Sequence, residues 1–210
     1  MNCRFNEWDI EEYLIYDTEK DCPVSSTAEL MLGAGRLSCG NDVFCREGTV
    51  QAGLLAQSIS KGEATTDDLE LLREVIEIVH ANADCEMARS AAKQALWLLD
   101  EYPDVWEQHV TRKLCPMLAC KALYTVHADP AKCTGCGACT AVCPQGAIRG
   151  GEGLIHIIDN DKCDRCGACI AVCPESAIIK AGSVKPKTPD EPVPAGTFEG
   201  GGRRKRRGRA

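Results

Sequence analysis

Large aromatic side chains and long apolar runs are both scarce in this sequence. Phe, Trp and Tyr make up only 5% of the residues, so bulky rings contribute little to any core. No stretch approaches the ~20 apolar residues that cross a bilayer, and we predict no membrane-spanning helix. Residues 1–20 are acidic and lack the apolar run of a secretory signal. We therefore expect a cytoplasmic protein whose thiols stay reduced.

Common motifs of catalysis are also missing. The sequence contains no G-x-G-x-x-G and no phosphate-cradling loop. No Ser/His/Asp or Cys/His arrangement for a nucleophile is apparent. We therefore expect that the chain binds neither NADH nor flavin and catalyses no bond chemistry by itself.

Charge of one sign is concentrated at the C-terminal end. Residues 203–209 (RRKRRGR) carry six positive charges, so the net charge of −7 leaves −13 on the rest. Such an acidic body is unsuited to nucleic acid but could dock on a basic patch of a partner. The tail can bind phosphates weakly, although we expect it to dock on an acidic partner or to act as a solubilising end.

Cysteine, by contrast, is abundant, with 15 residues, an odd number that argues against a closed set of disulfides. Residues 133–148 (CTGCGACTAVCPQGAI) and 163–178 (CDRCGACIAVCPESAI) agree at 11 of 16 positions. Each is a C-x2-C-x2-C-x3-C-P string, the spacing that binds a [4Fe–4S] cluster. Zinc in C-x2-C pairs is the alternative, but zinc needs neither the third cysteine nor the fourth with its proline.

The fourth cysteine of each string is expected to reach the other cluster, because the turn at Pro144 or Pro174 reverses the chain. The predicted ligand sets are Cys133, Cys136, Cys139 and Cys173 for one cluster, and Cys163, Cys166, Cys169 and Cys143 for the other. Apolar side chains are expected to exclude water around both clusters: Val142, Ile148, Val172 and Ile178. The portion that holds the two strings resembles bacterial two-[4Fe–4S] ferredoxins at every motif position.

The fold class that we predict is α+β, a small helical bundle followed by a ferredoxin-like domain. Thr65 with Asp68 indicates a capping box, the apolar residues that follow recur at helical spacing, and Pro103 ends a later helix. Short strands are expected near 122–127 and 154–158. The predicted parts are an N-terminal segment (1–25), the bundle (26–113), a hinge (114–121), the two-cluster domain (122–180) and a Pro/Gly-rich arm with the basic tail (181–210).

Residues 38–48 (SCGNDVFCREG) and the more distant Cys85 form a second pattern. It resembles the iron–sulfur segment of the flavin- and NADH-binding subunit of complex I and of electron-bifurcating hydrogenases. The resemblance covers roughly residues 22–125 and continues into the ferredoxin module, without the flavin domain. It implies a third cluster on the bundle, bound by Cys39, Cys45 and Cys85.

The chain departs from this pattern at the middle cysteine, where it has Asp42. Three outcomes follow for the site: Asp42 ligates the fourth iron through oxygen, the cluster has three irons, or the site holds no cluster or another metal.

A further set, Cys22, His109, Cys115 and Cys120, suits a closed Cys3His zinc site. The related hydrogenase subunits have a similar C-P-x-x-x-C hinge preceded by a His. The alternative is a surface histidine with free thiols. The remaining histidines, His80, His127 and His156, have no ligand constellation and are predicted to be ordinary.

These patterns predict a subunit that relays single electrons within a larger redox complex, of the hydrogenase, formate dehydrogenase or other flavin-based type. The expected partners are a flavin- and NAD(P)H-binding subunit, a catalytic metalloenzyme subunit, or a soluble ferredoxin. The hinge could let the ferredoxin module move between partners, by analogy with the hydrogenases. A non-redox iron–sulfur and zinc scaffold, or a regulatory interaction protein, is the alternative.

Overall fold

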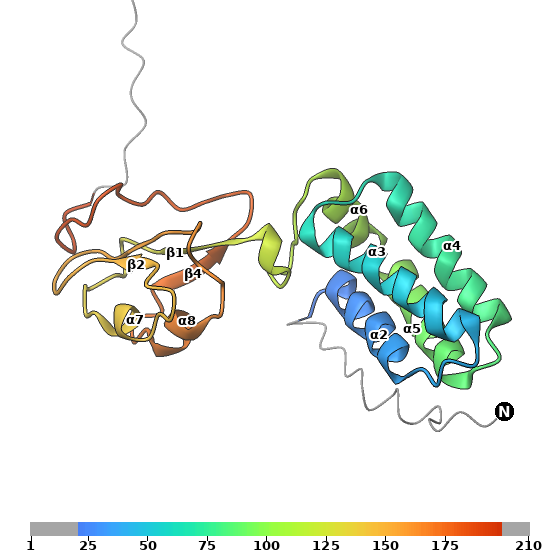
Figure 1. Ribbon diagram of the computed structural model, residues 1–210. Helices are drawn as coiled ribbons and strands as arrows, with labels where there is room; N and C mark the ends of the chain where they lie inside the picture. The colour runs from blue at the N-terminus through green and yellow to red at the C-terminus, as the bar shows by residue number, and fades with distance from the viewer. Residues whose placement is uncertain (1–20, 199–210) are drawn as a thin grey trace, which may run out of the picture. The chain divides into compact units, whose positions relative to one another are not determined.

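The computed structural model describes residues 21–198, which divide between Tyr124 and Thr125 into two units. The first unit is helical and the second carries short strands and one-turn helices, as the predicted α+β class requires (Figure 1). Residues 1–20 and the basic tail at 203–209 lie outside the described part. None of the helices in that part is both long and apolar enough to span a membrane.

In the described part of the first unit, which begins at residue 21, five α-helices and a π-helical turn, η1, form the bundle. They are α2 (Pro23–Leu37), η1 (Phe44–Gly48), α3 (Thr49–Lys61), α4 (Thr66–Asn82), α5 (Glu86–Glu101) and α6 (Pro103–Thr111). The predicted capping box is confirmed, because the Thr65 hydroxyl accepts from the Asp68 amide while the Asp68 carboxylate accepts from the Thr65 amide. Pro103 separates α5 from α6 and occupies the first turn of α6, where its missing N–H has no helical partner to lose.

Small side chains let these helices approach closely. The inward face of α5 is mostly alanine, and Ala88, Ala92 and Ala95 are fully buried. At the contact of α2 with α3, a Cβ on Gly53 would lie 2.8 Å from the backbone nitrogen of Leu32, so only glycine fits. Trp106 is the large exception: it is buried and its Nε1 donates to the carbonyl of Leu98 at 3.1 Å.

The predicted hinge, residues 114–121, packs within the first unit. Cys115 and Cys120 are buried in its core, and a 3-10 turn, η2 (Lys121–Leu123), follows them. The first strand therefore begins at Thr125 and not at 122 as the sequence predicts.

The second unit contains two small antiparallel sheets. Its strands are β1 (Thr125–Ala128), β2 (Ile148–Arg149), β3 (Ile157–Ile158) and β4 (Ile178–Ala181), and its one-turn helices are α7 (Ala138–Ala141) and α8 (Ala168–Val172). Strand β1 pairs with β4, with Val126 opposite Lys180, and β2 pairs with β3. Strand β1 precedes the first cysteine string and pairs with β4 at the end of the second string. Strand β3 precedes the second string and pairs with β2 at the end of the first.

The described part of the Pro/Gly-rich arm is extended and hydrogen-bonds to the rest of the second unit. The Ile155 amide donates to the Val193 carbonyl at 2.8 Å, and the Ala195 amide donates to the Gly153 carbonyl at 2.9 Å. This pairing occupies residues 153–155, and the predicted strand near 154–158 is accordingly reduced to β3.

Candidate metal centres

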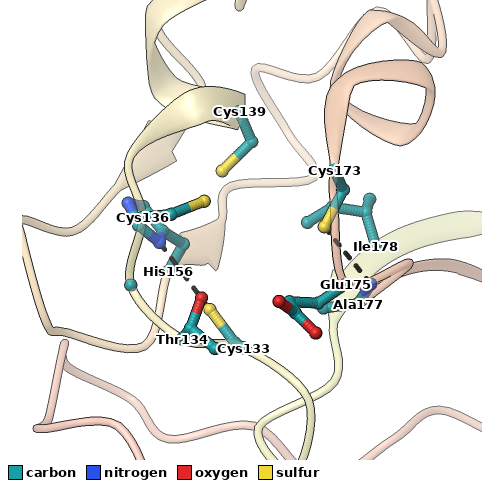
Figure 2. Close-up of a pocket in the computed structure, with 10 residues that line it drawn as sticks. Cys133, Thr134, Cys136, Cys139, His156, Cys173, Glu175, Ala177 and Ile178 are labelled. Atoms are coloured by element: carbon teal, nitrogen blue, oxygen red, sulfur yellow. Dashed lines mark hydrogen bonds between the residues drawn. The ribbon is translucent and has the colours of Figure 1, made fainter.

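The first cysteine string and one distant cysteine line a common pocket. Cys133 and Cys136 lie on the loop that enters α7, Cys139 lies in α7, and Cys173 faces them from the segment before β4 (Figure 2). The whole pocket, including its part open to solvent, has a volume of about 300 Å³. Four thiols around one space are the donor set of a [4Fe–4S] cluster, so the residues present fit that group.

The second pocket repeats the first with the corresponding residues of the other string. It is lined by Cys163, Cys166, Cys169 and Cys143 and has a similar volume of about 330 Å³. The structure therefore brings together both of the four-cysteine sets that the sequence predicts, including the exchange of Cys143 and Cys173 between the two strings.

Backbone geometry supports the thiols in the same way at both pockets. Gly137 and Gly167 precede α7 and α8 with φ of 77° and 82°, a left-handed conformation that side chains disfavour. The sulfur of Cys143 accepts from the Ala147 amide at 3.4 Å, and that of Cys173 from the Ala177 amide at 3.3 Å. These bonds orient the fourth thiol of each set.

The predicted apolar cover is half wrong. Ile148 and Ile178 are buried and line the two pockets. Val142 and Val172, however, are 38% and 39% exposed, because the one-turn helices end at these residues and leave their side chains at the surface.

The sequence predicts an ordinary role for His156, but the structure places this residue in the first pocket. Its side chain is buried, and its Nδ1 lies 3.7 Å from the sulfur of Cys133 (Figure 2). Burial lowers the pKa of His156, which favours the neutral ring. The signal available in the sequence is that His156 corresponds to Val126 in the repeat. His80 and His127 make local contacts with the Arg89 carbonyl and the Thr125 hydroxyl.

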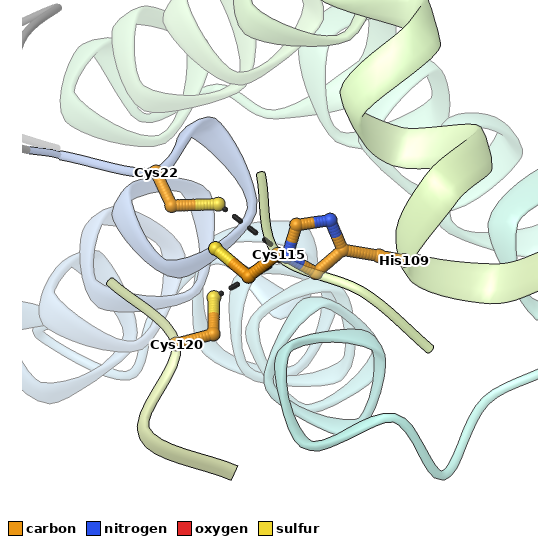
Figure 3. A group of neighbouring side chains, drawn as sticks. All are labelled: Cys22, His109, Cys115 and Cys120. Carbon is orange, nitrogen blue, oxygen red and sulfur yellow. Dashed lines mark hydrogen bonds between the residues drawn. The ribbon is translucent and has the colours of Figure 1, made fainter. Parts of the chain in front are cut away.

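A separate buried group consists of Cys22, His109, Cys115 and Cys120. Their ligand atoms all lie within 4.8 Å of one another (Figure 3). Cys22 immediately precedes α2, His109 lies on α6, and the other two thiols come from the loop after α6. The His109 Nδ1 is 2.8 Å from the Val105 carbonyl, which directs Nε2 toward the thiols.

Hydrogen bonds within this group shift the pKa of three of its members. Burial lowers the pKa of His109, but hydrogen bonds with Cys115 and Cys22 outweigh it and raise the pKa to about 10. Hydrogen bonds from Cys120 and Cys22 lower the pKa of Cys115, whereas the pKa of Cys120 is raised because it retains the proton that the two thiols share. A metal ion would replace such protons.

The third predicted set lies around the loop that leads into η1. Cys39 is exposed, while Cys45 and Cys85 are buried. Cys45 lies within η1, and Cys85 immediately precedes α5. A π-helical turn is rare and is often found at functional sites.

The Asp42 side chain links the start of η1 to the segment before α5 through hydrogen bonds. Its Oδ1 accepts from the backbone amides of Phe44 at 2.9 Å and Cys45 at 3.3 Å. Its Oδ2 accepts from the Cys85 amide at 3.0 Å, across 43 positions of sequence. Both oxygens are therefore already hydrogen-bonded by the chain at the starts of η1 and α5.

Comparisons with known proteins agree with this arrangement. Residues 26–109 match the NADH-ubiquinone oxidoreductase-F iron-sulfur binding region, and residues 132–178 match a 4Fe-4S dicluster domain. The NADP-reducing hydrogenase subunit HndC of Solidesulfovibrio fructosivorans is 38% identical over 132 residues, covering 63% of this chain and 27% of that protein. The F subunit of the NADH-quinone oxidoreductase of Streptomyces coelicolor is 29% identical over 97 residues, covering 46% and 19%. The chain thus spans about a quarter or less of these relatives.

The substitution Asp42→Ala is expected to loosen the loop locally. Hydrogen bonds to a charged group contribute about 1.5–3 kcal/mol, so exchange of the amides at Phe44, Cys45 and Cys85 should accelerate about tenfold or more. Hydrogen exchange followed by mass spectrometry of peptides covering these residues measures the effect. The control is Glu47→Ala, whose carboxylate pairs with Arg46 at the surface. Equal exchange in both variants would show that Asp42 does not hold the loop.

Proposed function

We propose that this chain is an electron-transfer subunit of an oxidoreductase complex. The premise is that it carries the iron–sulfur region of the NADH-ubiquinone oxidoreductase-F type, followed by a dicluster domain. The observation that carries the proposal is the pair of equivalent four-cysteine pockets within one small unit. Each bound [4Fe–4S] cluster would take up and release one electron.

The protein's part in this function is to hold, shield and expose the clusters. Amides donate to the fourth thiol of each set, and buried Ile148 and Ile178 limit water on one side. Cys136 and Cys166 are exposed, so each ligand set also reaches the surface. An electron can therefore pass to a docked partner without crossing a thick layer of protein.

We extend the proposal to a third cluster at Cys39, Cys45 and Cys85. Asp42 stands at the position of the fourth ligand, and its carboxylate is held by three backbone amides. Three thiolates then bind the cluster, while the fourth iron faces a carboxylate oxygen or solvent. Such an iron is bound more weakly than one held by thiolate, because oxygen is the harder ligand.

The group of Cys22, His109, Cys115 and Cys120 is proposed as a structural zinc site. A closed set of three thiolates and one imidazole is typical of structural zinc. The ion would join the segment before α2 to α6 and to the loop after it. Its role is to stabilise the first unit and not to carry electrons, because zinc has no redox chemistry.

The partners that we propose are a flavin- and NAD(P)H-binding subunit, a catalytic metalloenzyme subunit, or a soluble ferredoxin in the cytoplasm. The support for partner subunits is that the two relatives are, by name, subunits of a hydrogenase and of a quinone oxidoreductase. A non-redox scaffold remains the competing function, and reversible reduction distinguishes the two.

Anaerobically purified protein with intact clusters is expected to take up about one electron for each cluster of the second unit. Stepwise titration with dithionite, followed by visible absorption and EPR, measures the uptake, and reoxidation should restore the starting spectrum. If iron and sulfide contents are full and no low-potential donor reduces the clusters, electron transfer is not the function.

Full loading of all three sites corresponds to about twelve irons per chain. Oxidation with ferricyanide should release the iron beside Asp42 as Fe²⁺, converting [4Fe–4S]²⁺ to [3Fe–4S]⁺ with the loss of one electron and giving an EPR signal. Asp42→Cys should suppress this signal by supplying a fourth thiolate. A total of eight irons in protein whose second unit is fully loaded would rule out the third cluster.

Metal analysis is expected to give about one zinc per chain. Cys120→Ser should abolish zinc binding and lower the melting temperature of the helical unit by at least about 4–8 °C, the equivalent of 1 kcal/mol for a domain of this size. The control is Cys39→Ser, which should lose iron and keep zinc. Protein that contains no zinc as isolated would contradict the assignment.

A further inference from the structure

The two cluster pockets differ at one buried position. A constant offset in sequence relates every matching pair of cysteines, and the same offset relates Val126 in the second pocket to His156 in the first. Both side chains are 2% exposed. An apolar group in one pocket thus corresponds to a hydrogen-bonding ring in the other.

The residue opposite this buried position also differs between the two pockets. Val126 lies opposite Lys180 in the sheet of β1 and β4. The residue that corresponds to Lys180 in the repeat is Gly150, where a Cβ would lie 2.6 Å from Cδ2 of His156. The absence of a side chain at Gly150 therefore makes room for the imidazole.

The polar contacts of the ring point to the cluster ligands. Nδ1 of His156 lies 3.7 Å from Sγ of Cys133, and Nε2 is buried without a hydrogen-bond partner in the described part of the chain. A ring placed only to fill a protein core would be expected to satisfy both nitrogens with protein groups. Among residues 21–198, the one polar contact of this ring is with a predicted cluster thiol.

We propose that His156 donates a hydrogen bond from Nδ1–H to the Cys133 thiolate and so raises the reduction potential of that cluster alone. The proposal rests on the function above, since it requires a cluster in this pocket. Hydrogen bonds to the sulfurs are among the factors that set the potentials of iron–sulfur clusters. The donor stabilises the additional negative charge of the reduced cluster, and Val126 offers the other cluster no such donor.

Charged side chains near the pockets do not account for the proposed difference in reduction potential. Glu175 lines the first pocket, and the neighbouring pair Asp164 and Arg165 lines the second. Glu175 and Asp164 are exposed and Arg165 is half-buried, so water and salt screen their charges. His156 itself is buried and its contact with Cys133 is partly buried, so screening is weaker there.

Two reciprocal substitutions test the proposal. His156→Phe should lower the potential of one cluster, and Val126→His in a Lys180→Gly background should raise that of the other relative to Lys180→Gly alone. Each change should alter the ratio of reduced to oxidised cluster at a given potential about tenfold, or about 59 mV for one electron. EPR-monitored redox titration of the full chain measures both potentials, and iron content establishes that the clusters are loaded.

A spectroscopic measurement separates hydrogen bonding from packing. With ¹⁵N-labelled histidine, pulsed EPR of the reduced protein should detect a nitrogen coupled to a cluster, and His156→Phe should remove that coupling. Reducible clusters with unchanged potentials in His156→Phe would overturn the role of His156 and leave electron transfer intact. Loaded clusters that no donor reduces would overturn both proposals.

Discussion

The exchange of a thiol between the two cysteine strings is the constraint on which the second unit depends. Cys173 completes the pocket of the first string and Cys143 that of the second. The strands follow the same rule, since β1 pairs with β4 and β2 with β3. Strands of two to four residues form few hydrogen bonds and are marginal alone. Metal–thiolate bonds across the exchange would therefore supply, once clusters are bound, much of the cohesion that a larger core would otherwise give.

Three of the predicted metal ligands in the first unit lie where helices begin. Cys22 immediately precedes α2, Cys85 immediately precedes α5, and Asp42 lies just before η1. Alanine-rich helix contacts fill the rest of the core, which explains how the unit packs with so few aromatic residues.

Most of this architecture could be predicted from local sequence patterns. Features that depend on contacts between residues far apart in the sequence could not. The repeated spacing with proline after the fourth cysteine identified both pocket sets, and Thr65 with Asp68 identified the start of α4. The role of Asp42 was hidden because the amide of Cys85 lies 43 positions away. His156 looked ordinary because its partner, Cys133, is 23 positions away and only the repeat relates them. The exposure of Val142 and Val172 follows from where one-turn helices end, which spacing alone does not specify.

The exchange of the fourth thiol also determines whether one half of the second unit, with a single cysteine string, could complete a site by itself. One half has three thiols for one cluster and a fourth that points to a different cluster, so a single half closes neither site. Two copies of one half, related by a twofold axis, would close two identical sites, as in any self-complementary dimer. When both halves belong to one chain, their sequences no longer have to be identical. Each position of the repeat is then free to differ, and the two centres can acquire separate properties while they share one scaffold.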